Sequence, residues 1–468
     1  MAELKAEVPN VARPLRDKIP PGPHGHFLLG NVREIQRDSI GFNMAMARQY
    51  GDVIRVRVIT WPTYMVFHPD DVRHVLQENN RNYNKDVFNV NLLKPLLGQG
   101  LFTNDGTSWL HQRRLMQPAF HRKRLAEFGT LMTSTTVTML EQWHNSADHD
   151  QTLDVAEEMM RLTLRIVGEA LFTIDRSLEA DTVGQAFTAV RTLLADYVLN
   201  PFPPLGFPAP RNRRLQAAIR SLDSVVQVII NERRKHNTDT GDLLSMLMLA
   251  RDEETGEGMN DRQLRDEVMT LLLAGHETTS NALTWTWYLL SQYPDVERRL
   301  HAELDDVLGG NLPTVEHLPD LKYTHMVIEE ALRLYPPVLG FGRKAIGEDV
   351  LGGYYVPANT NIWLSPYVTH RHPDFWENPE MFDPERFSPE RSANRPHFAH
   401  FPFGGGPRLC MGSNFAMMEA QLILATIAQC YRLKLVPGHV VEPEILLTLR
   451  PRNGLPMTLE RIAQSSYH

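Results

Sequence analysis

Cysteine is scarce in this chain: Cys410 and Cys430 are the two in 468 residues. So few cysteines cannot build the dense disulfide framework of a small secreted protein, and they are typical of a reducing compartment. We therefore expect a cytoplasmic protein. Each cysteine is then either a small buried apolar side chain or a ligating or reactive thiol.

Long apolar runs are also missing. The longest, 268–275 and 281–290, contain polar residues and fall short of the ~20 residues that a membrane-spanning helix needs. The polar leader, residues 1–19, has charges scattered through it and no apolar core of the kind found in signal peptides. The sequence therefore predicts no membrane anchor.

Charge is neither extreme nor clustered. The net charge is −8, with 48 Lys and Arg against 56 Asp and Glu, and no long run of like charge suggests a nucleic-acid partner. The chain is 42% hydrophobic and 22% charged, as is typical of globular proteins. Because it contains no repeat, low-complexity tract or linker, we expect residues 20–468 to form a single domain. We also expect the protein to be a monomer.

Periodicity predicts a mainly helical protein with a smaller β-rich lobe. Residues 53–59, VIRVRVI, alternate apolar and charged side chains as a half-buried strand does. Five prolines within 198–210 require a loop, either a connector or a mobile lid. Apolar spacing of three and four residues predicts helices over 151–172, 211–236, 261–292, 321–335 and 415–432. Segment 261–292 is apolar on most faces, which indicates a buried central helix.

The segment around Cys410 has the properties that a metal-binding thiolate needs. It reads FGGGPRLCMG over Phe403–Gly412, just before a helix expected to begin near Ser413. Three consecutive glycines let the backbone approach a flat group closely, because no Cβ intervenes. The helix N-terminus favours the thiolate over the thiol. Cys430, expected inside the final helix, is interpreted as a core side chain.

This segment resembles the F-x-x-G-x-R-x-C-x-G haem loop of the cytochrome P450 family and matches every fixed position. Three further motifs follow the family's order: WLHQR over Trp109–Arg113, AGHETT over Ala274–Thr279 and EALR over Glu330–Arg333. The resemblance covers nearly the whole chain from about Pro20. It implies the P450 fold, in which a long central helix lies over the haem.

The resemblance also implies how haem b is held. Cys410 would be the axial iron ligand. A spacing of four puts Trp109 and Arg113 on one helix face, and a haem propionate could lie between them. By the same resemblance, the further haem contacts are Arg343, Arg408, Phe403, Ala274 and Gly275.

The motif in the central helix points to oxygen chemistry. Gly275 and the Thr278 hydroxyl, which can bond the carbonyl four residues back, could open a groove, although a simple kink is the alternative. By resemblance, Thr278 would stabilise bound dioxygen and Glu277 would help to deliver protons. His276–Glu277 is not a zinc-protease motif, because Ser280 stands where the second histidine should be. The loop histidines His370, His372, His397 and His400 are interpreted as structural.

Two further sets follow from the resemblance. Glu330 and Arg333 share a helix face and can pair, and Arg386 would join them in a structural cluster. The substrate-pocket positions are nearly all apolar, which predicts a fatty-acid, terpenoid or steroid-like substrate. They are Phe88, Leu92, Leu93, Leu96, Leu101, Phe102, Leu271, Val338, Leu339 and Phe341.

Electrons would have to come from another protein. The chain has no G-x-G-x-x-G fingerprint, so NAD(P)H would act through a ferredoxin- or flavodoxin-type partner. Basic residues Arg113–Arg114 and 121–124 could dock that partner, or could be a solvated face. The alternatives to a monooxygenase are a thiolate-haem peroxygenase or isomerase and a non-catalytic haem sensor; the Glu277–Thr278 pair favours the monooxygenase.

Overall fold

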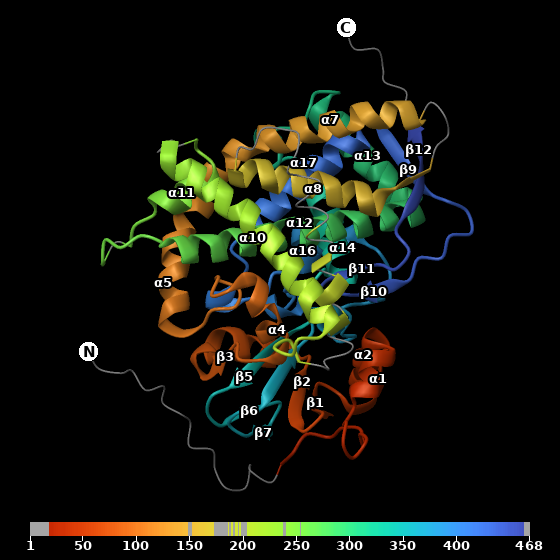
Figure 1. Ribbon diagram of the computed structural model, residues 1–468. Helices are drawn as coiled ribbons and strands as arrows, with labels where there is room; N and C mark the ends of the chain where they lie inside the picture. Colours follow the sequence, from red (N-terminus) through yellow and green to blue (C-terminus); the bar gives the residue numbers. More distant parts are fainter. Residues whose placement is uncertain are drawn as a thin grey trace.

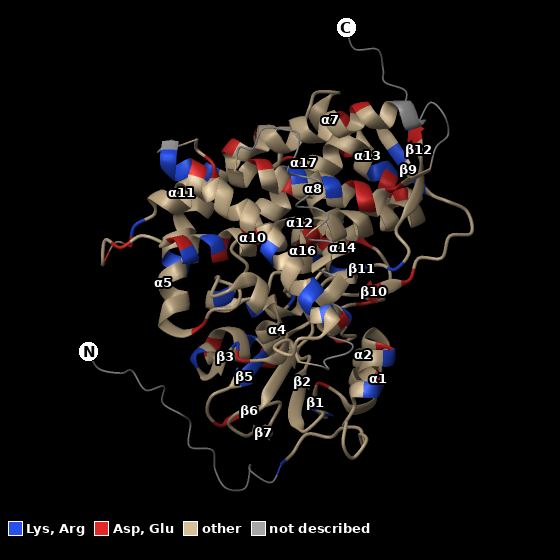
Figure 2. Cartoon of the chain, viewed as in Figure 1, with Lys and Arg blue, Asp and Glu red and all other residues tan. Residues whose placement is uncertain are grey.

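The computed structural model describes residues 18–147, 152–172, 186, 189–190, 192–194, 196–197, 204–236, 240–252 and 254–462. Helices form a large lobe, and a smaller β-rich lobe lies below it in Figure 1. This arrangement confirms the predicted fold class. Acidic and basic residues are interspersed over both lobes (Figure 2).

The β-rich lobe is built on a five-stranded sheet in the order β1-β2-β8-β5-β3. Its strands are β1 (Val53–Val58), β2 (Trp61–Val66), β3 (Tyr83–Asn84), β5 (Phe341–Ala345) and β8 (Asn361–Leu364). β2 and β8 are parallel, and the other neighbours are antiparallel. α1 (Val32–Arg37) and α2 (Ser39–Tyr50) precede the sheet, and Phe42 and Met46 of α2 pack with Ile54 and Val56 of β1. β1 therefore confirms the predicted strand.

Smaller elements complete this lobe and its connections. They are α3 (Pro69–Arg73), α15 (Pro366–Thr369), α16 (Pro389–Ser392) and the hairpin of β6 (Asp349–Leu351) with β7 (Tyr354–Val356). At the outer edge of the helical lobe, β4 (Thr152–Asp154), β12 (Pro456–Arg461) and β9 (Tyr431–Leu435) form a second sheet in that order. β10 (Pro443–Ile445) and β11 (Leu449–Pro451) form a hairpin.

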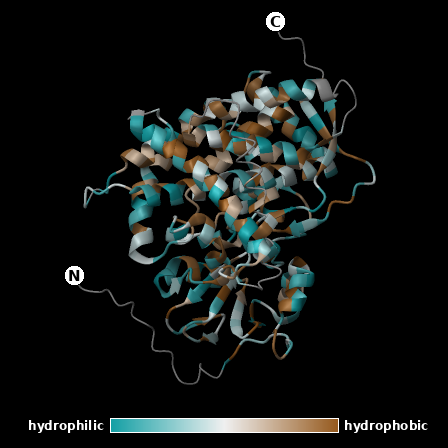
Figure 3. Ribbon diagram, viewed as in Figure 1, coloured by the Kyte–Doolittle hydropathy of each residue, from teal (hydrophilic) through white to brown (hydrophobic). Residues whose placement is uncertain are grey.

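The helical lobe contains the main apolar core. Its helices are α4 (Phe88–Leu97), α5 (Gly106–Met116), α6 (Arg122–Leu125), α7 (Gly129–Ala147), α8 (Val155–Phe172), α10 (Pro210–His236), α11 (Leu243–Leu249), α12 (Asp261–Gln292), α13 (Pro294–Leu308), α14 (Lys322–Leu334) and α17 (Ser413–Ala428). Hydrophilic and hydrophobic residues alternate along many of them (Figure 3). None of the helices in the described ranges is long and apolar enough to cross a membrane.

α12 is the predicted central helix, and its ends follow from local sequence. Asn260 and Gln263 form a capping box at its start, which satisfies free N–H groups of the first turn. Pro294 opens the next helix, α13, and the residue before a proline is disfavoured in helical conformation. α12 packs beside α8 and is covered by α10 in Figure 1.

Two helix predictions need correction. Residues 152–154 are extended, because they pair with β12, and α8 begins only at Val155. The final helix ends at Ala428, because Tyr431 must be extended to pair with Arg461. Cys430 therefore lies between α17 and β9, where it packs half-buried against the core. Of the proline-rich segment, residues 198–203 lie outside the described residues, and α10 begins at Pro210.

Candidate functional site

Cys410 lies at the end of a tight loop before α17. The Cys410 N–H donates to the Phe403 carbonyl at 3.0 Å, and the Gly404 N–H donates to the Phe401 carbonyl at 3.0 Å. Gly406 has φ +63°, and a Cβ there would lie 1.9 Å from the carbonyl oxygen of Leu76. Only glycine fits such a position, so this glycine lets the loop pack directly on neighbouring backbone.

The Cys410 thiol is solvent-accessible, yet it lies deep in the protein. Burial raises its pKa, and this effect outweighs the Gly412 backbone N–H and the Arg113 charge, which both lower it. Open surface at such depth means that the thiol faces an internal space. The Gly412 N–H at the start of the helix thus acts in the predicted direction, but in the protein without a bound cation burial has the larger effect on the pKa. A bound cation such as a haem iron would be needed to hold this sulfur deprotonated.

One face of α12 is also open inside the protein. Leu271, Ala274, Gly275 and Thr278 are accessible, whereas most of their neighbours along the helix are buried. Their spacing of three and four residues places them on one face. The Thr278 hydroxyl donates to the Ala274 carbonyl at 2.6 Å. A Cβ on Gly275 would lie 3.0 Å from Val167, so this glycine allows α8 to pack closely. We call these four residues the open stripe.

Glu277 lies beside the open stripe and is buried. Its Oε1 accepts a hydrogen bond of 2.8 Å from the Thr448 hydroxyl, and that hydroxyl accepts one of 2.8 Å from the Asn281 amide. Thr448 immediately precedes β11, so the hairpin of β10 and β11 holds the acid in place. The sequence analysis did not identify Thr448, because no local signal links it to a helix 171 residues away.

Basic side chains gather around Trp109 of α5. Arg113 Nη1 donates to the Leu409 carbonyl at 2.8 Å, and the Arg408 guanidinium lies 4.8 Å from the Trp109 ring centre. Arg408 also pairs with Asp105. Burial lowers the pKa of Arg343 to about 10, with a further contribution from the charge of Arg408. The structure thus brings the four predicted propionate contacts to one region.

Lys85 belongs to the same group and was missed from the sequence. Its Nζ donates to the carbonyls of Leu101 at 2.9 Å and Phe102 at 2.8 Å. Burial lowers the pKa of Lys85 to about 7, and the charges of Arg408 and Arg343 add to that effect. Lys85 lies in a segment without a motif, so only the fold reveals it.

This basic cluster, comprising Lys85, Trp109, Arg113, Arg343 and Arg408, fits an anionic group. Arg408 Nη1 is buried and has no hydrogen-bond partner in the described part of the chain. Mutual repulsion among buried cations is relieved by carboxylates placed between them. The two propionates of a haem would supply such carboxylates, with the Cys410 sulfur available to the iron.

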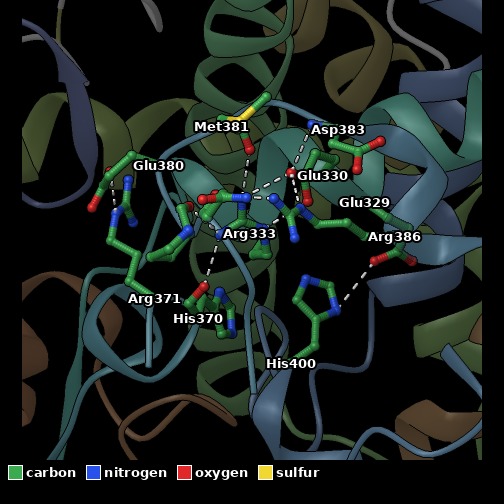
Figure 4. Close-up of polar contacts among 12 residues, drawn as sticks. Glu329, Glu330, Arg333, His370, Arg371, Glu380, Met381, Asp383, Arg386 and His400 are labelled. Carbon is green, nitrogen blue, oxygen red and sulfur yellow. Dashed lines mark hydrogen bonds and ion pairs between the residues drawn. The ribbon is translucent and has the colours of Figure 1, made fainter. Parts of the chain in front are cut away.

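Glu330, Arg333 and Arg386 meet in a buried cluster (Figure 4). Arg333 donates to both oxygens of Glu330, at 2.6 and 2.8 Å, and Arg386 Nε lies 3.3 Å from Glu330 Oε1. Arg333 also donates to the carbonyls of His370, Pro379 and Met381. These contacts tie α14 to the segment that precedes the Cys410 loop.

The predicted pocket residues divide into three groups by their exposure. Leu92, Leu96 and Leu339 are buried in apolar clusters, so they support the walls instead of facing an open space. Phe88 and Phe102 are exposed. The partly buried positions, with Phe403 from the haem set, are Leu93, Leu101, Leu271, Val338, Phe341 and Phe403.

The basic stretch could either dock a redox partner or be a solvated face, and its residues Arg113, Arg114 and Arg124 contact other parts of the chain. Arg113 points inward to the Leu409 carbonyl. Arg114 pairs with Glu254 at 3.0 Å, and Arg124 lies 3.7 Å from Glu127. The side chains at positions 122 and 123 lie outside the described residues. Arg113 is therefore engaged with the Cys410 loop, and the charges of Arg114 and Arg124 are partly neutralised.

Comparison with known proteins supports the same family along the chain. The cytochrome P450 profile matches residues 20–456. Cyclooctatin synthase of Streptomyces melanosporofaciens is 37% identical over 94% of this chain and 95% of its own length. Cyclooctat-9-en-7-ol 5-monooxygenase of the same species is 38% identical over 88% of each chain. The cytochrome P450DA haem domain superposes with a TM-score of 0.87 at 29% identity, covering 95% of this chain and 98% of that domain. The chain belongs to the cytochrome P450 family, whose members use haem and dioxygen, and it is a cytochrome P450 monooxygenase.

Proposed function

We propose that this monooxygenase inserts one oxygen atom from O2 into a C–H bond of an apolar terpenoid-like molecule, using haem b bound through Cys410. The observation that carries the proposal is the pair of open surfaces inside the protein, the Cys410 thiol and the open stripe of α12. Both are accessible where the surrounding residues are buried. A flat cofactor with substrate above it would fill such a space.

When bound, the haem supplies oxygen activation, and the protein controls it. Cys410 would hold the haem through its sulfur, and a thiolate ligand would favour oxygen activation by donating electron density. The Thr278 hydroxyl, now bonded to the Ala274 carbonyl, would turn to hold and relay protons in the open space. Glu277, held by Thr448, transfers protons toward Thr278. The basic cluster, Lys85 included, would hold the propionates.

The proposed substrate class rests on the apolar residues around the open stripe and on the name of one relative. Leu271, Ala274, Leu93, Leu101 and Phe341 are apolar and accessible, so burial of apolar area provides most of the binding free energy. The relative named as acting on cyclooctat-9-en-7-ol takes an unsaturated alcohol. We therefore favour terpenes and their alcohols over fatty acids and steroids. Spectral titration with these three classes tests the choice, and tighter binding of fatty acids would contradict it.

The proposal extends to the setting of the reaction. Residues 20–468 act as one catalytic domain, as a monomer, in the cytoplasm. A ferredoxin- or flavodoxin-type protein passes electrons from NAD(P)H. Two free cysteines support a reducing location.

The deciding experiment is the spectrum of the reduced carbon-monoxide complex. The parent protein should show the strongly red-shifted Soret band of thiolate ligation, and Cys410→Ala should lose it. Cys430→Ala is the matched control and should keep it. An unshifted band in the parent would exclude thiolate ligation, and product formation without an electron donor would favour a peroxygenase.

A further inference from the structure

His370 lies between the Glu330–Arg333 pair and the loop that carries Cys410 (Figure 4). The His370 carbonyl accepts a hydrogen bond of 2.9 Å from Arg333 Nη1. Its ring Nε2 accepts one of 2.9 Å from the Phe401 N–H. The side chain is fully buried. One residue therefore contacts both the buried ion pair of α14 and the segment leading to the cysteine.

The hydrogen bond from the Phe401 N–H to His370 lies at the start of the Cys410 loop and can control its position. The Phe401 carbonyl accepts from the Gly404 N–H at 3.0 Å, and two residues beyond Phe401 the Phe403 carbonyl accepts from the Cys410 N–H at 3.0 Å. The loop thus folds back on a residue whose own N–H is held by His370. A displacement of Phe401 would therefore reach Cys410 through these two backbone hydrogen bonds.

The protonation state of His370 agrees with an acceptor role. To accept from Phe401, Nε2 must lack a proton, so the proton resides on Nδ1. Nδ1 is buried and has no partner in the described residues. Burial lowers the pKa of His370, and the nearby His400, Arg333 and Arg371 lower it further. An unpaired buried donor such as Nδ1–H is unfavourable. The hydrogen bond accepted by Nε2 is therefore the polar contact that explains an imidazole at this position.

We propose that His370 is a positioning residue, which fixes the Cys410 loop relative to Arg333 through the bond from the Phe401 N–H to Nε2. The role of Cys410 in this inference rests on the proposed function. His370 touches neither substrate nor reacting atoms. Without its acceptor nitrogen the loop relaxes, and the cysteine sulfur is held less firmly for metal ligation.

Two substitutions of His370 test whether the position of the acceptor atom matters, because both keep a polar side chain. The amide oxygen of His370→Gln can occupy the position of Nε2, whereas the shorter side chain of His370→Asn reaches only the position of Nδ1. In His370→Asn we expect the Phe401 amide to exchange its hydrogen about tenfold faster. We also expect the reduced carbon-monoxide complex to lose much of its thiolate band. His370→Gln should resemble the parent in both measurements.

The control is His301→Asn. His301 is another buried histidine, it lies on α13, and its ring makes a hydrogen bond with the backbone of Ala428. This variant should leave Phe401 exchange and the thiolate band unchanged. Parent-like exchange in His370→Asn, or equal loss in the control, would overturn the inference. A parent protein without the thiolate band would instead contradict the proposed function, and Phe401 exchange would still decide whether His370 holds the loop.

Discussion

The Thr448 hydroxyl donates a 2.8 Å hydrogen bond to Oε1 of Glu277, joining a hairpin near the C-terminus to the central helix. Thr448 in turn accepts from Asn281 at 2.8 Å. These two bonds commit Oε1 of the Glu277 side chain to Thr448. The hairpin of β10 and β11 thereby sets the orientation of the acid.

Thr448→Val keeps the shape of the side chain but removes the donor. Glu277 then loses its anchor, so we expect product formed per reductant consumed to fall about tenfold, because a misplaced acid transfers protons less efficiently. Thr448→Ser retains the hydroxyl and should restore coupling. Product and peroxide are measured against reductant consumption. Full coupling in Thr448→Val would show that the anchor is dispensable.

Thr278→Ala should divert reductant to peroxide while substrate binding persists. The hydroxyl lost is the one on the open stripe, where oxygen would be held. Thr279→Ala is the matched control, because Thr279 is buried on another face of α12. Peroxide yield with each variant distinguishes them. Equal yields would place the proton-handling hydroxyl elsewhere.

Haem affinity should depend on pH through Lys85. Burial lowers the Lys85 pKa to about 7, so in the haem-free protein its charge is present below pH 7 and lost above it. Propionates bind the charged form better, so haem affinity should fall as pH rises from about 6 to 8.5. Lys85→Met should bind haem more weakly at pH 6 and show a flatter profile. Lys94→Met, on α4, is the control, and haem transfer to an acceptor globin measures the affinity.

Glu267→Gln should stabilise the protein at neutral pH. Burial raises the Glu267 pKa to about 7 from 4.5, although the Leu101 N–H opposes this effect. The folded state therefore holds a proton that the unfolded state releases, so stability falls as pH rises from 4.5 through 7. The effect reaches about 3 kcal/mol above pH 7. Gln keeps an acceptor for the Leu101 N–H, so the unfolding free energy of the variant should not decline over this pH range. If the decline is unchanged in the variant, another group causes it.

Local sequence was sufficient for some features and not for others. α12 spans Asp261–Gln292 as its periodicity predicted. The Cys410 loop could also be predicted from the sequence, because its glycines are required by contacts such as that of Gly406 with Leu76. Lys85 and Thr448 could not be identified from the sequence, since each acts through a partner distant in sequence. Leu96 could not be separated from true lining residues, because both kinds are apolar.

The parallel pairing of β2 with β8 also bears on how the chain is made. Thr63–Val66 pair with Asn361–Leu364, so the hairpin of β1 and β2 leaves the ribosome long before the strand that completes its sheet. At 5–20 residues per second, the wait lasts about 15 to 60 s. During that time an unpaired edge is open to other chains. Slower translation or early chaperone binding would therefore affect the yield of the β-rich lobe more than that of the locally folded helices.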